Sequence, residues 1–303
     1  MEFGISNKES FLRPTGFSTF TPTSCPNRRT LRLKCFPSEC GLRPFLETPV
    51  SKPYISNISG DIALPGEWPW QVVLLKEGLH VCDGTLVSPQ WVLTAASCFE
   101  GSNMPPKTPW TVRLGALRPT GSQHPWMQES SLIGVVTSSS GSFALSRLSD
   151  PVIPDNYIGT VCLPETGSHS TKGDEFFSLI WGNKGDRLES VKLNVTTCHN
   201  NGSEPSNLIC AIEGESSGKQ YCQDTGLPGK PLFLHSHHDS SGKKKQRWTI
   251  VGVDSGRRIG NGKAESVTCA EWVFEGVRQS LDWIKHTTQG ISEAGENAFA
   301  GGG

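Results

Sequence analysis

The chain of 303 residues lacks the features of a membrane-spanning, nucleic-acid-binding or metal-knuckle protein. No run of 18 apolar residues occurs, so the sequence offers no candidate for a transmembrane segment. The 28 basic and 29 acidic residues nearly cancel, so no overall field would attract nucleic acid or an anionic membrane. No two cysteines have Cys-x-x-Cys spacing, and the histidines at 235–238 lack a metal-ligand pattern, so we expect neither a metal nor a cofactor.

Cysteine is the residue type that the sequence has in quantity, with ten copies between Cys25 and Cys269. An even number without metal-site spacing favours disulfides, and disulfides favour an oxidising, extracellular compartment. Residues 1–10 contain no apolar core of the kind found in a signal peptide. We therefore expect either the downstream part of a larger ectodomain, secreted or tethered, or a chain that starts at an internal or alternative site.

Short β-type runs bounded by Gly, Pro or Ser predict many strands at spacings near ten residues, which is typical of an antiparallel barrel or sandwich. These runs lie at 71–75, 85–87, 91–93, 131–136 and 248–253. One helix is predicted over 277–286, where Val277, Leu281 and Ile284 recur at helical spacing. After Gln289 the sequence is typical of a flexible tail.

Four stretches carry a family resemblance. Residues 80–98 read HVCDGTLVSPQWVLTAASC and match the motif H-x-C-G-G-[ST]-L-I-x-x-x-W-[VI]-[LV]-[ST]-A-A-H-C almost throughout. GEWPWQV at 66–72, CLP at 162–164 and LDWI at 281–284 fit the same pattern. Together they resemble the trypsin-like serine proteases, which implies an all-β fold of two six-stranded antiparallel barrels with a C-terminal helix. The resemblance implies a leader with pro-segment at 1–57, a protease homology domain at 58–287 and a tail at 288–303.

The resemblance also implies a disulfide pattern. The family's pairs correspond here to Cys82–Cys98, Cys198–Cys210, Cys222–Cys269 and, from the pro-segment, Cys40–Cys162. Upstream, Cys25 and Cys35 followed by Cys40-Gly41 resemble the end of a scavenger-receptor cysteine-rich domain, as in hepsin- and corin-like mosaic proteases. Cys25 and Cys35 could pair with each other, and a disulfide-containing leader without that domain is an equal alternative.

The residues that carry catalysis in this family are replaced. A serine nucleophile, a histidine base and an orienting aspartate are required, together with backbone N–H donors for the oxyanion. The histidine position holds Ser97 and the aspartate position holds Ser142. Read back from Pro231-Leu232, the serine position holds Pro228, which has neither a hydroxyl nor an N–H. A two-residue insertion leaves the register open, so Thr225 could lie near this position, although without a base.

The specificity pocket and the activation site also depart from the family. Gln220 stands where a trypsin has an acidic pocket floor, and Trp272 replaces a glycine of the pocket wall, either filling the pocket or turning outward. Asn57 precedes the expected new terminus at Ile58, where the family has Arg or Lys, and Leu227 replaces the buried aspartate that receives the freed ammonium.

Two surface features suggest modification or binding. Asn57, Asn194 and Asn201 each begin an Asn-x-Ser/Thr sequon, so glycosylation is expected in a secretory setting. Lys243, Lys244, Lys245 and Arg247 follow a histidine-rich stretch in an expected hairpin loop. This loop is either a solvated surface or a site for a sulfated glycan or another anionic partner, with a metal site as a third alternative.

The sequence therefore predicts a catalytically inactive serine protease homologue that acts as an extracellular binding or regulatory module. The alternative is a divergent but active serine-type endopeptidase. The partner, an extracellular protein or a sulfated glycan, is not identified by any motif.

Overall fold

A computed structural model describes most of the region from Cys40 onward. The described residues are 40–47, 62–101, 109–121, 123–165, 174–182, 187–198, 207–214, 227–238, 244–256 and 272–297. Cys25 and Cys35 lie outside this part of the chain. No helix among the described residues is long and apolar enough to cross a membrane.

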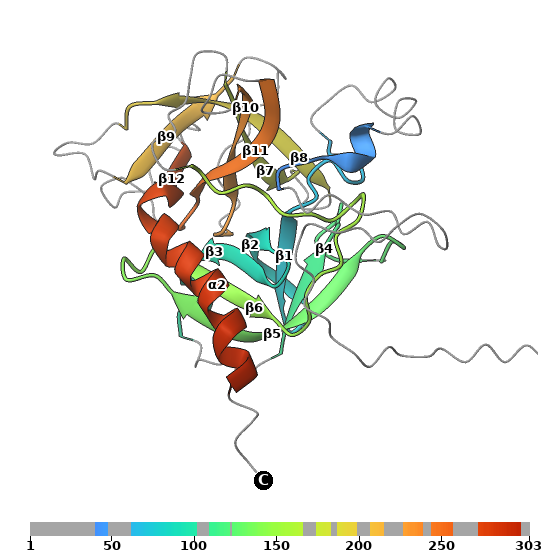
Figure 1. The fold of residues 1–303 in the computed structure, drawn as a ribbon. Coiled ribbons are helices and arrows are strands. Elements are labelled where there is room, and N and C mark those ends of the chain that lie inside the picture. Colours follow the sequence, from blue (N-terminus) through green and yellow to red (C-terminus); the bar gives the residue numbers. More distant parts are fainter. Residues whose placement is uncertain are drawn as a thin grey trace, which may run out of the picture. The chain divides into compact units, whose positions relative to one another are not determined.

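Six strands close the first barrel in the order β1-β2-β3-β6-β5-β4, with β1 pairing antiparallel to both β2 and β4 (Figure 1). They are β1 Gln71–Lys76, β2 Leu79–Ser88, β3 Trp91–Ala95, β4 Trp110–Leu114, β5 Gln128–Thr137 and β6 Phe143–Leu148. Strand β1 is buried from Gln71 to Leu75, which explains its continuous apolar run, whereas β5 alternates between half-buried and exposed residues.

The second barrel repeats this plan in the order β10-β11-β12-β9-β8-β7, closed by antiparallel pairing of β10 with β7. Its strands are β7 Glu175–Trp181, β8 Leu188–Thr196, β9 Leu208–Glu213, β10 Pro231–His238, β11 Lys244–Val253 and β12 Trp272–Gly276. The expected fold of two six-stranded antiparallel barrels is confirmed, and each of the five predicted β runs lies within a strand.

An aromatic cluster lies at the junction of the barrels. Trp68 and Trp70 precede β1, Phe233 belongs to β10 and Trp248 to β11, and all four side chains are buried. Trp68 stacks on Phe233 at 5.6 Å and meets Trp248 edge-on at 4.8 Å. Because this cluster is continuous with the core of the first barrel, the two barrels share apolar packing along their seam.

The C-terminal helix is longer than predicted. A short 3₁₀ turn, η3 (Val277–Ser280), leads into α2 (Leu281–Asn297), and the predicted apolar residues Val277, Leu281 and Ile284 are buried. The expectation of a flexible tail from 288 onward was therefore wrong for residues 288–297, while 298–303 lie outside the described residues. Once the packed first turns exist, adding residues to a helix costs little, and the Glu and Ala residues here are good helix formers.

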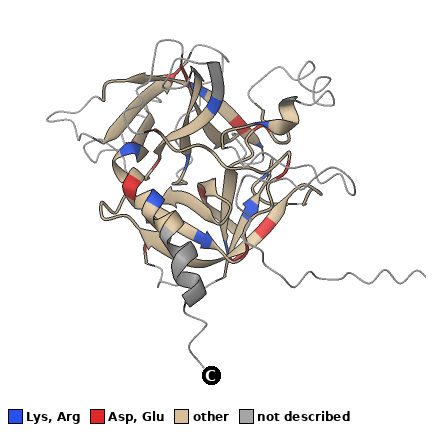
Figure 2. Cartoon of the chain, viewed as in Figure 1, with Lys and Arg blue, Asp and Glu red and all other residues tan. Residues whose placement is uncertain are grey.

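Charged residues are spread over both barrels and α2 in this view rather than gathered on one side (Figure 2). This agrees with the nearly balanced charge of the whole chain. Any recognition of a polyanion must therefore depend on a local group of cations.

Candidate functional site

The structure brings together, at the seam, the three positions that the family resemblance assigns to the triad. Ser97 lies in η2 (Ala96–Phe99), directly after β3, and Ser142 directly precedes β6. Strands β3 and β6 pair at their ends, and the N–H of Ala96 donates to the carbonyl of Ser142 over 3.0 Å. Pro228 approaches from the second barrel: a Cβ placed on Gly256 would lie 3.3 Å from Pro228 Cβ and 3.6 Å from Ser97 Oγ.

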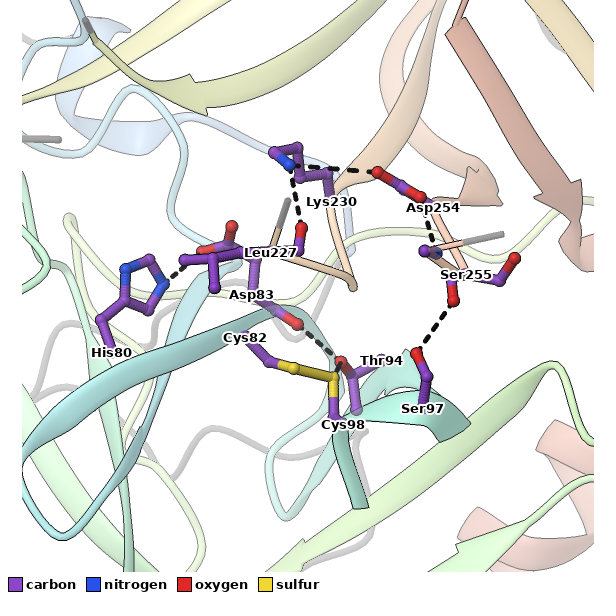
Figure 3. Close-up of a disulfide and its surroundings, with 11 residues drawn as sticks. His80, Cys82, Asp83, Thr94, Ser97, Cys98, Leu227, Lys230, Asp254 and Ser255 are labelled. Carbon is purple, nitrogen blue, oxygen red and sulfur yellow. Dashed lines mark hydrogen bonds and ion pairs between the residues drawn. A yellow bond between two sulfur atoms is a disulfide. The ribbon is translucent and has the colours of Figure 1, made fainter. Parts of the chain in front are cut away.

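None of these three side chains has a catalytic partner in the described structure. The hydroxyl of Ser97 donates to the backbone carbonyl of Ser255 over 2.9 Å (Figure 3). Ser142 is buried and uncharged, so it could not stabilise an imidazolium. Pro228 has no side-chain nucleophile, and its carbonyl accepts the N–H of Asp83 over 3.0 Å.

Gly229 fixes the course of the chain after Pro228. Its φ of +93° belongs to the region that favours glycine, and a Cβ here would lie 1.9 Å from the carbonyl oxygen of Asp83. The same Cβ would lie 2.6 Å from Thr94 Oγ1, whose hydroxyl donates to that carbonyl. The segment 227–230 therefore packs directly onto the backbone of β2.

A buried ion pair joins this segment to the loop after β11. Lys230 Nζ donates to the carbonyl of Leu227 over 2.8 Å and lies 3.9 Å from Asp254 Oδ2 (Figure 3). Both side chains are buried, and Asp254 Oδ1 accepts the N–H of Gly256 over 2.8 Å. Backbone hydrogen bonds between Gly229 and Asp254, and between Asp254 and Lys230, complete the connection. The loops that carry Pro228 and Gly256 thus hold each other in place.

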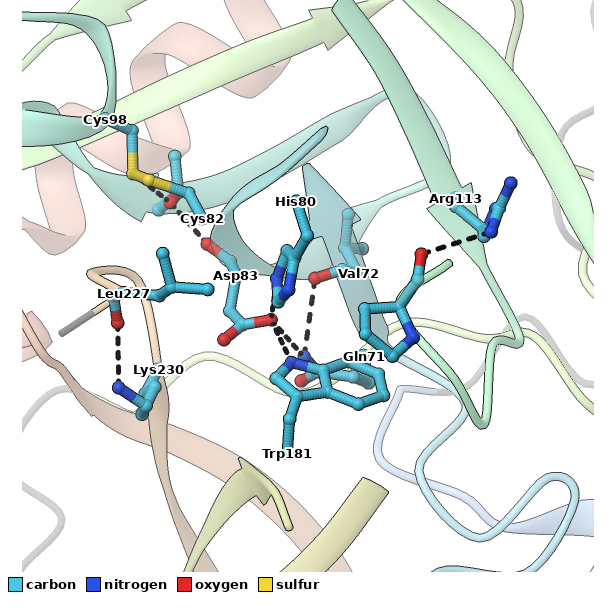
Figure 4. A network of polar contacts seen from close by, with 12 residues as sticks. Gln71, Val72, His80, Cys82, Asp83, Cys98, Arg113, Trp181, Leu227 and Lys230 are labelled. Carbon is cyan, nitrogen blue, oxygen red and sulfur yellow. Dashed lines mark hydrogen bonds and ion pairs between the residues drawn. A yellow bond between two sulfur atoms is a disulfide. The ribbon is translucent and has the colours of Figure 1, made fainter. Parts of the chain in front are cut away.

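Asp83 is a second buried charge, at a position where the family motif has glycine. Its Oδ1 accepts hydrogen bonds from the indole N–H of Trp181 at 2.8 Å and from Gln71 Nε2 at 3.3 Å, and lies 3.2 Å from His80 Nε2 (Figure 4). Its Oδ2 has no hydrogen-bond partner, and the side chain is 1% exposed. Leu227 also points toward this carboxylate in Figure 4. Asp83 links β2 of the first barrel to β7 of the second.

Sequence reasoning missed both networks. The sequence shows that Asp83 replaces the first glycine of the C-G-G motif, but it does not indicate which residues bond to the Asp83 side chain. Lys230 was visible as the residue before Pro231, and lysine is almost never fully buried without a partner. The partner, Asp254, lies on another strand end that local patterns could not place beside it.

Trp272 is buried, with 2% of its surface exposed, so it does not turn outward as a surface group. It begins β12, pairs with Ala211 of β9 and stacks on Phe274 with ring centroids 6.2 Å apart. Gln220 lies outside the described residues, as do Thr225 and Ile58.

The expected hairpin for the basic stretch is present, because β10 pairs with β11. Lys244 and Lys245 begin β11, and Lys243 lies outside the described residues. Arg247 differs from the lysines, since its Nη1 donates to the carbonyl of Cys40 over 2.7 Å. It therefore serves an internal contact. No group of three or more His, Cys, Asp or Glu within the described ranges could hold a metal ion.

Three disulfides lie within the described ranges: Cys40–Cys162, Cys82–Cys98 and Cys198–Cys210. They are three of the four pairs that the resemblance implies. Cys222 and Cys269, the fourth pair, lie outside the described residues. Among the sequons, Asn194 is exposed on β8, whereas Asn57 and Asn201 lie outside the described part of the chain.

Comparison with known proteins agrees with this architecture. The family model named Trypsin matches residues 57–284. Human Transmembrane protease serine 5 is 28% identical over 295 residues, covering 88% of this chain and 57% of that protein. Serine protease 56 is 30% identical in both mouse and human, covering 65% of this chain and 36% of the relative. The chain thus spans little more than half of the first relative and about a third of the others.

Proposed function

Since the chain belongs to the trypsin family, we propose that its trypsin-like domain is catalytically inactive and serves as an extracellular binding or regulatory module. The observation that carries this proposal is that the side chains at the site either bond to the protein's own backbone or have no reactive group. The Ser97 hydroxyl is bonded to Ser255, and Pro228 supplies neither a nucleophile nor its own N–H. Losing one oxyanion donor alone typically costs about 3 kcal/mol of transition-state stabilisation.

Several observations support an inactive scaffold over a divergent endopeptidase. The space between Ser97 and Pro228 borders Gly256, whose loop is tied to Lys230 through Asp254. Trp272, which the family resemblance places at a pocket-wall glycine, is buried. Opposing this, the relatives named above carry protease names, so the proposal needs a direct test.

The extracellular assignment rests on the three disulfides, which are typical of oxidising compartments. Exposed Asn194, within an Asn-Val-Thr sequon, is accessible for glycosylation in that setting. The match to Transmembrane protease serine 5 covers more of the chain than the family model does. We propose that residues 1–57 are a leader with a scavenger-receptor-like remnant and a pro-segment.

The test uses a fluorophosphonate probe, which labels activated serine nucleophiles. The unmodified protein should not be labelled. A triple variant carrying Ser97→His, Ser142→Asp and Pro228→Ser should also stay unlabelled, because Trp272 would still fill the pocket and misplace the substrate. Leu227 would still provide no acid for a freed ammonium.

Adding Trp272→Gly, Leu227→Asp and Asn57→Arg, followed by cleavage after residue 57, should be needed before labelling appears. Labelling of the triple variant would show that the pocket and activation arguments are wrong. Peptide cleavage by the unmodified protein would establish the alternative, an active endopeptidase. Circular dichroism of each variant would separate lost folding from lost chemistry.

A further inference from the structure

Residues 40–47, which we call the clasp, pack on the domain through more than their disulfide. The N–H of Gly41 donates to the carbonyl of Thr160 over 2.7 Å, and the N–H of Trp248 donates to the carbonyl of Gly41 over 3.2 Å. Gly41 has a φ of +69°, and a Cβ there would lie 2.5 Å from the carbonyl oxygen of Trp248. The clasp therefore lies flush against β11.

Farther along, the clasp ends in the short 3₁₀ turn η1 (Pro44–Glu47). Phe45 in this turn is 9% exposed, and its ring lies 5.0 Å from that of Tyr157. A Cβ on Gly66 would lie 2.8 Å from Phe45 Cβ, so the domain's backbone approaches the clasp closely here as well. Both ends of the clasp thus pack against the rest of the domain.

Arg43 stands at its centre, in a corner made by two indole rings. The Trp68 and Trp248 rings are inclined at 76°, and the guanidinium carbon lies 3.9 Å and 3.8 Å from their centroids. Glu67 is the nearby carboxylate, 3.9 Å from Nη1, while Nε and Nη2 make no hydrogen bond in the described structure. Arg43 is therefore held mainly by the faces of aromatic rings.

Burying the Arg43 guanidinium in this way has a desolvation cost that packing alone would not explain. Burial lowers the pKa of Arg43 to about 9, with Glu67 acting in the opposite direction. Two buried guanidinium nitrogens, Nε and Nη2, have no hydrogen-bond acceptor, which adds a further cost. A planar, weakly hydrated guanidinium can recover it by stacking, whereas a lysine ammonium could not stack in this way.

We propose that the Trp68–Trp248 corner is a binding site for an arginine-bearing peptide, and that its occupant is this chain's own clasp. The site keeps the clasp on the domain when both covalent links, the Cys40–Cys162 disulfide and the backbone after Glu47, are broken. The protein would then persist as two associated chains. This inference is independent of whether the domain is catalytic.

The test is made in the full chain. A recognition sequence for a site-specific protease is inserted between Glu47 and Ile62, and Cys40→Ser and Cys162→Ser remove the disulfide. After cleavage, the N-terminal fragment should co-elute with the domain in gel filtration. In an Arg43→Ala background it should dissociate at least about 30-fold faster, because two cation–π contacts, each contributing at least about 1 kcal/mol, are lost.

Arg43→Lys separates charge from stacking and should behave more like Arg43→Ala than like the parent. Arg113→Ala, which removes an arginine paired with Glu129 on the first barrel, is the matched control and should leave retention unchanged. Equal release rates with and without Arg43, or immediate loss of the fragment from the parent, would overturn the proposal. If the serine variants do not fold, the disulfide-containing protein is cut first and then reduced, and the release rates are compared in the same way.

Discussion

Replacing Asp83 tests how much of the inter-barrel contact depends on one carboxylate. In the parent, the indole N–H of Trp181 donates to Asp83 Oδ1 over 2.8 Å. In Asp83→Ala this N–H would lose its acceptor inside the protein. Gln71 Nε2 and His80 Nε2 would lose the same oxygen, at 3.3 Å and 3.2 Å. Hydrogen bonds to charged groups contribute about 1.5–3 kcal/mol each, and the two longer ones belong at the low end of that range.

The opposing term is the burial of the carboxylate itself. Asp83 is 1% exposed and its Oδ2 has no hydrogen-bond partner, so alanine relieves a desolvation cost of several kcal/mol. We expect a net loss of about 2–4 kcal/mol in the free energy of unfolding, near the range seen when one member of a buried polar pair is removed. Asp83→Asn keeps an acceptor oxygen in place and should lose about 2 kcal/mol less than Asp83→Ala.

The measurement is urea denaturation followed by tryptophan fluorescence, with the midpoint compared at constant slope. Asp150→Ala serves as the control, because Asp150 is exposed and should change stability by less than about 0.5 kcal/mol. If Asp83→Ala proved as stable as the parent, the prediction would be wrong, because the hydrogen bonds to Asp83 would then be fully offset by the desolvation cost of its carboxylate. If Asp83→Asn lost as much as Asp83→Ala, the negative charge rather than the acceptor would hold the barrels together.

The remaining predictions concern the loops and the covalent structure. Gly229→Ala should lose at least about 4 kcal/mol of stability, because its Cβ would lie 1.9 Å from a backbone oxygen at a φ of +93°, and retention of the parent's melting temperature would contradict this contact. Replacing residues 243–245 together with alanine should abolish retention on heparin at low salt, where salt screens an electrostatic attraction to the three lysines least. Arg247→Ala should instead lower thermal stability with little effect on heparin, and retention that survives the lysine replacement would remove this role from the loop. Non-reducing peptide mapping should find Cys222 joined to Cys269, and either cysteine in another pair would refute the family pattern for that bond.

Much of the fold could be predicted because its signals are local or carried by the family motif. The run at 80–98 matched the family motif over β2 and β3 of the first barrel, and the apolar spacing of Val277, Leu281 and Ile284 located the helix. The end of the helix could not be found in the same way, because Gly290 and Gly295 interrupt the pattern without stopping the chain from continuing as helix.

The candidate site was predictable as a set of replaced positions but not as a set of contacts. Substitution of Ser97 and Pro228 could be read from the alignment of motifs alone. The contact of Lys230 with Asp254 depends on the register of β10 with β11, and the contact of Arg43 with Trp248, some 200 residues later, depends on the tertiary fold. Such long-range contacts leave no periodic trace in a single sequence.

The disulfide joins Cys40 to Cys162 at a sequence separation of 122, and strands β1 to β6 all lie inside that interval. Closing a loop of this length lowers the entropy of the unfolded chain by the equivalent of about 5 kcal/mol in the chain-entropy description. Because β7 to β12 follow Cys162, this restriction acts on the unfolded first barrel alone. Reduction of this bond should therefore weaken one half of the molecule selectively, and a single cooperative melting transition should broaden or divide into two.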